Sequence, residues 1–422
     1  MTFTRRMVPV VCAAALLAAC TSGESPAPPT LAPTPTLAPT PTLGSAQADA
    51  VAAVVRATMA EQHLKAAIVR VTIDGREVIT QAFGESMTGV PATTDMHFRN
   101  GAVAIAYVAT LLLKLVDEKK VSLDDKLSTW LPDVPSSDRV TLGQLAQMTS
   151  GYVDYVIGNE PFTEAFYADP FKQREPQELL SFATSKPLLY EPGTNWDYAH
   201  TNYVLLGLAL EKATGQDMPT LMSEKVLKPL GLTNTSNSFT PEIPSPVLHA
   251  FTSERRSSLK VPDGSPFYED STYWNPSWTI THGAIQTTTI RDLEASAVGI
   301  GSGKLLSKDS YDAMVSTGLR GKTSALPGCT TCAPLGDFYT FGLGLVISGS
   351  WLLQSPSFAG ESGLMAYLPS QKVAIAVAAT YAPEAFDDKG EYRYSPNGAD
   401  ALFRKIGAQL VPLDAPPVRP AT

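Results

Sequence analysis

The segment FRNGAVAIAYVATLLLKLVDE, residues 98–118, predicts the centre of the fold. From Ala102 to Val116 it is almost entirely apolar, and only Thr110 and Lys114 interrupt the run. The run is long for a strand, and it is shorter than the roughly 20 apolar residues that cross a bilayer. It therefore predicts a helix buried in the protein core.

The residues before this helix predict a second helix and a hairpin. Residues 46–59 have the pattern of an amphipathic helix. Residues 66–73 then alternate as a strand, Asp74-Gly75 makes a turn, and residues 78–83 form the returning strand. An Asp-Gly pair between alternating runs is a strong hairpin signal.

The residues after the core helix predict a helical middle and a strand-rich end. Helices are expected over residues 142–148, 176–184, 203–214, 219–226 and 289–299. Strands are expected over residues 341–347, 363–368 and 373–380, followed by a helix over residues 398–410. Strands at both ends predict an α/β fold of the α+β kind, in which both chain ends build one antiparallel sheet around a large helical insert. The site is expected between the sheet and the insert.

Composition and charge limit the classes of protein that fit. Only 17% of the residues are charged and 44% are hydrophobic, so residues 46–414 are expected to form one large domain, or two closely packed lobes. The net charge of −9 and the lack of a basic run argue against a nucleic-acid partner. Residues 415–422 are expected to be a disordered tail.

The first residues predict export and lipid attachment. Residues 1–19 run from a basic end through an apolar stretch to small residues, as in an export signal. LAAC, residues 17–20, resembles the bacterial lipobox, which implies a lipoprotein whose signal is cut before a lipid-bearing cysteine. The resemblance makes Cys20 the expected lipid attachment site and the extracytoplasmic face of the cell membrane the expected location. An ordinary signal peptide with a chance cysteine is the alternative.

A low-complexity segment follows the signal. Residues 20–45 are mostly Pro, Thr, Ala and Ser, and the hexamer LAPTPT occurs twice in tandem from Leu31. Such a composition favours polyproline II at about 3.1 Å per residue. The segment is therefore expected to be a tether between the lipid and the domain.

Two cysteines, Cys329 and Cys332, lie near the C-terminal strands. In an exported protein this pair predicts a local disulfide that holds a loop. A thioredoxin-like redox site would need a strand-to-helix context, which is missing here, and a metal site would need two further ligands.

Several blocks of the sequence resemble the class C β-lactamase and D-alanyl-D-alanine carboxypeptidase family of serine hydrolases. Besides residues 98–118 they are VSLDD (121–125), QMTSGY (147–152), EPGTNWDYAHTNYVLLG (191–207), WNPSW (274–278), GAIQTTTIRDL (283–293) and FGLG (341–344). They occur in the family's order over nearly the whole domain. The resemblance implies a β-lactamase/transpeptidase-like fold, related to penicillin-binding proteins.

The first catalytic motif of that family is Ser-x-x-Lys at the start of the buried helix. The lysine lies one turn from the serine and activates it for acyl transfer. The matching positions in this chain are Ala102 and Ile105, which carry neither a hydroxyl nor an amine. Both side chains are expected to point into the cleft.

The second and third motifs are also altered. Tyr-x-Asn is matched by Tyr198 and His200, which keep the tyrosine but replace the asparagine, and both are expected to line a ligand cleft. His-x-Gly or Lys-Thr-Gly is matched by Gln354-Ser355-Pro356. A proline there removes a backbone N–H from the strand beside the site.

A displaced catalytic group or a metal has little support in the sequence. The one other Ser-x-x-Lys, Ser257 to Lys260, lies in a charged, Pro- and Gly-flanked stretch, and Lys322-Thr323-Ser324 precedes the cysteine loop. The five histidines show no metal-binding spacing, so no metal and no cofactor are expected.

The three altered motifs together predict a catalytically inactive family member, a pseudoenzyme. Losing either the nucleophile or its base can cost about 10⁶-fold in rate. The expected role is binding a peptidoglycan-like cell-wall peptide or a surface protein in the cleft, at the membrane. Two alternatives are an active serine hydrolase, such as a β-lactamase, carboxypeptidase or esterase, that uses a non-standard nucleophile, and a surface scaffold with a filled cleft.

Overall fold

The computed structural model describes residues 43–237, 240–282 and 284–419. The predicted signal peptide, Cys20 and the predicted tether as far as residue 42 lie outside the described residues. The first element, helix α1 (Leu43–Gln62), begins before residue 46, so the predicted tether extends too far. The alanine-rich sequence after Gly44 explains the early start, because alanine has the highest helix propensity.

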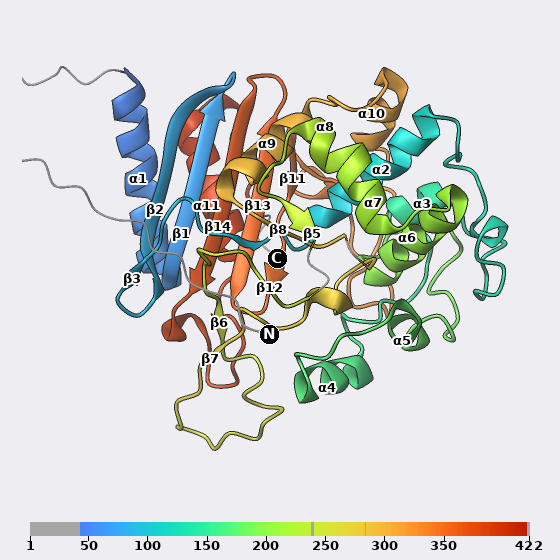
Figure 1. The fold of residues 1–422 in the computed structure, drawn as a ribbon, viewed down its shortest axis with the longest axis horizontal. Helices are drawn as coiled ribbons and strands as arrows, with labels where there is room; N and C mark the ends of the chain where they lie inside the picture. The colour runs from blue at the N-terminus through green and yellow to red at the C-terminus, as the bar shows by residue number, and fades with distance from the viewer. Residues whose placement is uncertain (1–42, 238–239, 283, 420–422) are drawn as a thin grey trace, which may run out of the picture. The chain divides into compact units, whose positions relative to one another are not determined.

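A nine-stranded antiparallel sheet forms the centre of the domain (Figure 1). The strands lie in the order β3-β2-β1-β14-β13-β11-β10-β9, and β12 pairs with β13. Their bounds are β1 (Leu64–Ile73), β2 (Arg76–Met87), β3 (Val90–Pro91), β9 (Thr340–Phe341), β10 (Val346–Ser348), β11 (Trp351–Gln354), β12 (Ser357–Phe358), β13 (Glu361–Leu368) and β14 (Val373–Tyr381). Two small sheets contain β4 (Phe98–Arg99), β8 (Gln286–Thr288) and β5 (Ser236–Asn237), and β6 (Phe251–Thr252) and β7 (Glu269–Asp270).

The N-terminal hairpin pairs directly with the last strand of the chain. Asp74 and Gly75 turn between β1 and β2, with φ values of 49° and 72°. On its other side β1 pairs with β14, and Ile68 lies opposite Ala378. This pairing confirms that both ends of the chain build one antiparallel sheet.

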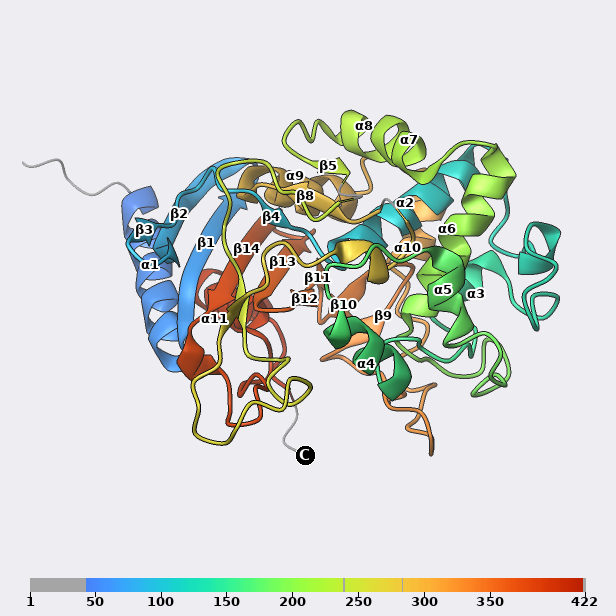
Figure 2. The same cartoon turned by 60° about the horizontal axis from the view of Figure 1, so that its bottom comes forward.

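Helices cover both faces of this sheet. Every residue of β13 and β14 is buried. Helix α9 (Ile290–Gly301) packs on one face, and α1 and α11 (Gly398–Leu410) pack on the other (Figures 1 and 2). The bounds of α11 agree with the predicted closing helix. A strand buried on both faces reads as a continuous apolar run, which matches β14 from Val373 to Ala379.

Helix α2 (Val103–Asp117) lies at the centre of the helical insert. All its residues from Val103 to Leu113 are buried, which confirms the predicted core helix. The other helices are α3 (Leu142–Ala146), α4 (Glu160–Ala168), α5 (Pro176–Ser181), α6 (His200–Thr214), α7 (Met218–Met222), α8 (Lys228–Leu230) and α10 (Lys308–Met314). The predicted helices 142–148 and 176–184 are therefore shorter in the structure, and α4 and α10 were not predicted. The predicted helix 219–226 is helical throughout, because a π-helical turn over Ser223–Leu227 joins α7 to α8. Among the described helices, none combines the length and the apolar character that a membrane crossing requires.

The strand predicted over residues 341–347 is two short strands, β9 and β10. A Cβ on Gly342 would lie 2.1 Å from the carbonyl oxygen of Met314, and Gly344 has φ of 72°. The two glycines therefore turn the chain, so that β9 and β10 pair with each other. Strand β11, which follows, was not predicted.

The predicted disordered tail is ordered as far as Arg419. Pro417 accepts a hydrogen bond of 2.6 Å from Arg404 through its carbonyl oxygen, and Pro416 packs against Gly407 of α11. The expectation of disorder from residue 415 is wrong for residues 415–419, because these residues contact α11.

Candidate functional site

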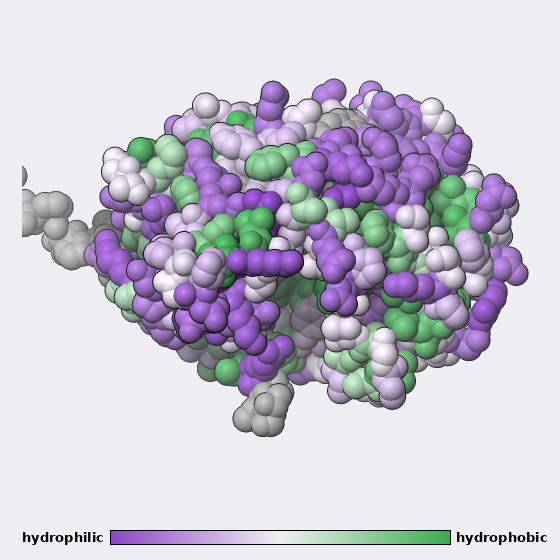
Figure 3. Space-filling model, turned by 90° about the horizontal axis from the view of Figure 1, so that it is seen from below, coloured by the Kyte–Doolittle hydropathy of each residue, from purple (hydrophilic) through white to green (hydrophobic). Residues whose placement is uncertain are grey.

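A cavity of about 470 Å³ lies between the central sheet and the helical insert, where the sequence predicts the site. The residues just before α2, the first residue of α6, the end of β11, the strand β12 and residues of α11 border it. The view from below shows a hollow near the centre of the surface, with hydrophobic residues inside it (Figure 3).

Hydrophobic and aromatic side chains form most of the cavity wall. They are Val156, Ile157, Trp278, Ile280, Ile285, Phe338, Tyr339, Val346, Leu353 and Phe358. The rings of Trp278 and Phe358 stack with their centroids 5.6 Å apart. Such a wall suits a ligand with an apolar body that a few polar groups hold in position.

Of the two first-motif positions, only Ala102 reaches the cavity. Ala102 is the N-cap residue of α2 and lines the cavity. Ile105 has no exposed surface and packs in the core. The expectation that both side chains point into the cleft is therefore wrong for Ile105. Pro356 packs closely against Gly101 at this end of the cavity, since a Cβ on Gly101 would lie 2.7 Å from the Cβ of Pro356.

A buried carboxylate holds His200 at the start of α6. Asp154 accepts hydrogen bonds from the backbone N–H of His200, at 2.9 Å, and from the backbone N–H groups of Val156 and Ile157. The second oxygen of Asp154 lies 3.0 Å from Nδ1 of His200. Because the carboxylate accepts, Nδ1 carries the proton and a neutral ring keeps Nε2 as an acceptor. His200 itself lines the cavity.

Tyr198 meets His200 edge to face. Their ring centroids are 5.4 Å apart and the planes are inclined by 85°. Burial raises the pKa of Tyr198 well above its usual range, and Tyr339 and Asp154 act in the same direction. The phenol therefore keeps its proton at neutral pH and can donate a hydrogen bond into the cavity. The expected cleft residues Tyr198 and His200 thus lie together at one wall.

The third-motif residues are bound to the protein itself. The side-chain amide of Gln354 donates to the carbonyl oxygen of Gly344 at 2.7 Å, and only 3% of Gln354 is exposed. Pro356 lies between β11 and β12 and interrupts the strand. Asn397 donates through Nδ2 to the side chains of Ser355 and Ser357, at 3.2 and 3.1 Å. These bonds fix the edge of the cavity.

Charged groups from the C-terminal helix line the other end of the cavity. Arg404 donates through Nε to Asp400 at 2.7 Å, and its guanidinium lies 4.3 Å from the ring centroid of Phe338. Burial raises the pKa of Asp400, while the charge and hydrogen bond of Arg404 lower it. Arg419 also lines this end and donates to Ser395.

Asp154, Trp278 and Arg404 were not predicted as site residues. Asp154 lies two residues after the block QMTSGY (147–152). An acidic residue between the apolar residues around it is the sequence signal that could have identified it. Arg404 gave no local signal, because it lies on an amphipathic helix where a surface charge is ordinary.

The other sequence candidates lie away from the cavity. Ser257 and Lys260 are exposed in a turn rather than on a helix. Within the described residues, one cluster has the donor atoms for a metal, namely Asp197, Cys329 and Cys332. The two sulfurs are joined in a disulfide with an S–S distance of 2.05 Å, so they are not thiolate ligands in this structure.

Comparison with known proteins places this geometry in a family. The profile of the Beta-lactamase family matches residues 51–397. The chain is 31% identical over 179 residues to Penicillin-binding protein 4 of Amycolatopsis lactamdurans, covering 41% of this chain and 44% of that protein. It is 25% identical over 267 residues to the putative penicillin-binding protein PbpX of Bacillus subtilis, covering 63% of this chain and 60% of that protein. The matches thus span less than two thirds of either relative.

Solved structures share the fold. The D-stereospecific amidohydrolase from Streptomyces superimposes with a TM-score of 0.68 at 23% identity, covering 86% of this chain and 98% of that one. The D-amino acid amidase from Ochrobactrum anthropi, complexed with D-phenylalanine, gives a TM-score of 0.67 at 19% identity with the same coverage of both chains. The expected β-lactamase/transpeptidase-like fold is confirmed.

Proposed function

The chain belongs to the Beta-lactamase family, and from this we propose that its domain binds a cell-wall ligand without acyl transfer. The proposed ligand is a short peptide that ends in a D-amino acid residue, held at the extracytoplasmic face of the membrane. A surface protein that presents such an end is the other partner we consider.

One observation carries the proposed lack of catalysis. The residue at the mouth of α2 is Ala102, and the residue one turn further along is the fully buried Ile105. Covalent acyl transfer needs a nucleophile with a base in hydrogen-bond reach. An alanine methyl group and a buried isoleucine supply neither.

The cavity supports the proposed binding role. Its volume of about 470 Å³ falls within the range of small-ligand sites, about 300–1,000 Å³. Tyr198 offers a hydroxyl donor and His200 a ring-nitrogen acceptor, while Trp278 and Phe358 offer stacked aromatic surface. The D-amino acid amidase with the same fold was solved with D-phenylalanine, which makes a D-residue with an aromatic side chain a reasonable first probe.

The first test separates binding from acylation. Intact-protein mass spectrometry after incubation with a penicillin should show no covalent adduct. Titration calorimetry with a D-phenylalanyl peptide should show binding, and Tyr198→Phe together with His200→Gln should weaken it by roughly tenfold or more, since each lost hydrogen bond contributes about 1 kcal/mol. Thr235→Val, a buried change near α9 and outside the cavity, is the control and should bind as the wild type does. A penicillin adduct on any cavity residue would overturn the proposal.

A second candidate function rests on the Asp154–His200 pair. A buried carboxylate that orients an imidazole is the arrangement with which hydrolases activate a nucleophile. Three serines, Ser355, Ser357 and Ser395, also line the cavity. An active hydrolase with one of these serines as nucleophile would be labelled by a fluorophosphonate probe in the wild type but not in His200→Gln.

A further inference from the structure

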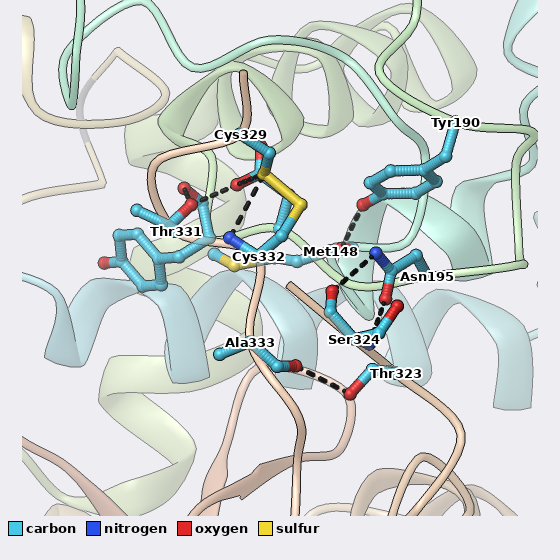
Figure 4. The surroundings of a disulfide bond; sticks show 11 residues. Met148, Tyr190, Asn195, Thr323, Ser324, Cys329, Thr331, Cys332 and Ala333 are labelled. Carbon is cyan, nitrogen blue, oxygen red and sulfur yellow. Dashed lines mark hydrogen bonds between the residues drawn. A yellow bond between two sulfur atoms is a disulfide. The ribbon is translucent and has the colours of Figure 1, made fainter. Parts of the chain in front are cut away.

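The disulfide Cys329–Cys332 lies in the loop between α10 and β9 (Figure 4). A hydrogen bond from Thr331 joins this loop to the backbone of Tyr198. The backbone N–H of Cys332 donates to the sulfur of Cys329 at 3.1 Å. Thr331 donates through its hydroxyl to the carboxyl group of Asp197 and to the carbonyl oxygen of Tyr198, the latter at 3.2 Å. The loop is therefore bound to the residues directly before the cavity wall.

The carboxyl group of Asp197 lies directly against the disulfide. Oδ1 of Asp197 lies 3.3 Å from Sγ of Cys329. A disulfide sulfur has no hydrogen to donate, so this is a van der Waals contact, and the same oxygen accepts a hydrogen bond from the hydroxyl of Thr331. Burial raises the pKa of Asp197 to about 7, with the Thr331 hydrogen bond lowering it and the charge of Asp154 raising it. The carboxyl group is thus able to give and take a proton near neutral pH.

The two sulfurs differ in access and in hydrogen bonding. Cys329 is half-buried, whereas Cys332 is 6% exposed. An incoming thiolate therefore meets the sulfur of Cys329 first. The N–H of Cys332 points at the same sulfur and stabilises negative charge on it after reduction, which favours a reactive thiolate at Cys329.

We propose that Cys329–Cys332 is a thiol–disulfide exchange site in which Asp197 is the proton donor and acceptor. A small thiol, as its thiolate, attacks Cys329, the S–S bond breaks, and Cys332 leaves as a thiolate. This thiolate takes the proton of Asp197, whose carboxyl oxygen lies within 4.8 Å of both sulfurs. A second thiolate attacks the mixed disulfide and releases Cys329 as a thiolate. Two thiols supply two electrons and become one disulfide, while the protein pair becomes a dithiol.

The loop that carries the disulfide contacts two segments of the cavity wall. A Cβ on Gly158 would lie 2.5 Å from the hydroxyl oxygen of Thr330, so the cysteine loop packs directly on the segment that contains Asp154 and Ile157. Thr331 holds the segment that contains Tyr198 and His200. Opening the disulfide therefore loosens both segments that position the Asp154–His200 pair. The proposal is independent of which ligand the cavity binds.

The neighbours of Asp197 affect the pKa of its carboxyl group. Asp154 raises the pKa of Asp197 through its charge, and Asp197 in turn raises the pKa of Tyr190. Asp154 in turn lies 3.0 Å from the ring nitrogen Nδ1 of His200. Cys329 and Thr331 touch the carboxyl group directly.

The test measures reduction of the folded full-length chain by glutathione. The rate is followed by mass spectrometry of alkylated peptides that contain Cys329 and Cys332, and it is divided by the thiolate concentration at each pH. Because protonated Asp197 donates, the wild-type value should fall by about a hundredfold as pH rises through about 7, the lower end of the effect expected for a positioned acid. In Asp197→Asn the value should be low and independent of pH.

Thr331→Val is the second variant and keeps Asp197. Its lost hydrogen bond lowers the pKa of Asp197 in the wild type, so the fall in rate should move to higher pH in this variant. Circular dichroism of each variant checks that it is folded. Amide hydrogen exchange over residues 197–200 should speed up on reduction.

Two results would overturn the proposal. One is a pH profile that is the same in the wild type and Asp197→Asn, since the carboxyl group then moves no proton. The other is a pair that glutathione reduces only after the chain unfolds, because the disulfide is then a structural link alone. Unchanged amide exchange over residues 197–200 would refute the coupling to the cavity.

Discussion

Ile105 and Ala102 show how the environment of a residue determines what it can do. A lysine at position 105 would have to place its amine in a core position with no exposed surface, whereas a serine at position 102 would face the cavity. Burying an amine without a partner is costly, and adding a hydroxyl at a cavity wall is not. A serine could therefore be restored at position 102 at a much smaller loss of stability than a lysine at position 105.

The first prediction compares these two positions. Ile105→Lys should lower the free energy of unfolding by roughly 3 kcal/mol or more, because the amine has no partner in the core. Ala102→Ser should change it by less than about 0.5 kcal/mol, since the hydroxyl reaches the cavity. Urea denaturation followed by circular dichroism measures both. Equal stability of the two variants would contradict the placement of Ile105.

At the scale of elements, Asn397 joins helix α11 to the cavity edge. Its Oδ1 accepts from the backbone N–H of Asp400 and so caps the helix, and its Nδ2 donates to Ser355 and Ser357. One side chain thus satisfies a helix end and fixes the interrupted strand. Substitutions at Asn397 can therefore remove the contacts to Ser355 and Ser357 while they keep or remove the helix cap.

The second prediction makes that separation. Asn397→Ala should lower the free energy of unfolding by about 1–2 kcal/mol, the usual effect of removing an N-cap. Asn397→Asp keeps the acceptor and adds a charge that suits a helix N-terminus, so less than half of that loss is expected. Both variants should change ligand affinity at the cavity by similar factors. Ser307→Ala, which uncaps α10 far from the cavity, should cost stability and leave affinity unchanged.

The elements with strong local patterns could be predicted from the sequence. The core helix α2, the hairpin at Asp74-Gly75 and the closing helix α11 follow from periodicity, turn chemistry and capping. The split of residues 341–347 into two strands could not be predicted, because it depends on the approach of Met314 to Gly342. The site residues also divide into those that local sequence predicts and those that depend on tertiary contacts. Tyr198 and His200 come from one sequence block, whereas Asp154 reaches His200 across 46 residues.

At the scale of the whole molecule, we propose that the domain is held to the membrane through Cys20 and a polyproline-rich tether. Residues 21–42 would extend for about 70 Å if they adopt polyproline II throughout, at about 3.1 Å per residue. A binding domain on such a tether can sample ligands over a wide area of the cell wall.

The third prediction tests the anchor. Metabolic labelling with an alkyne fatty acid should mark the wild type and leave Cys20→Ser unlabelled, because the lipid is carried by that sulfur. Cys12→Ser, which lies within the signal segment, is the matched control and should be labelled like the wild type. Labelling of Cys20→Ser at the wild-type level would refute the proposed anchor.

The pairing of β1 with β14 sets the order in which this protein can fold. Ile68 and Ala378 lie side by side in the sheet although more than three hundred residues separate them in the chain. Contacts between such distant residues form slowly, because the intervening chain must first be brought together. During synthesis the N-terminal hairpin emerges early and keeps one edge unpaired until the last strand arrives, so nascent chains are exposed to aggregation over that interval. A chain that stops before β14 leaves that edge open permanently.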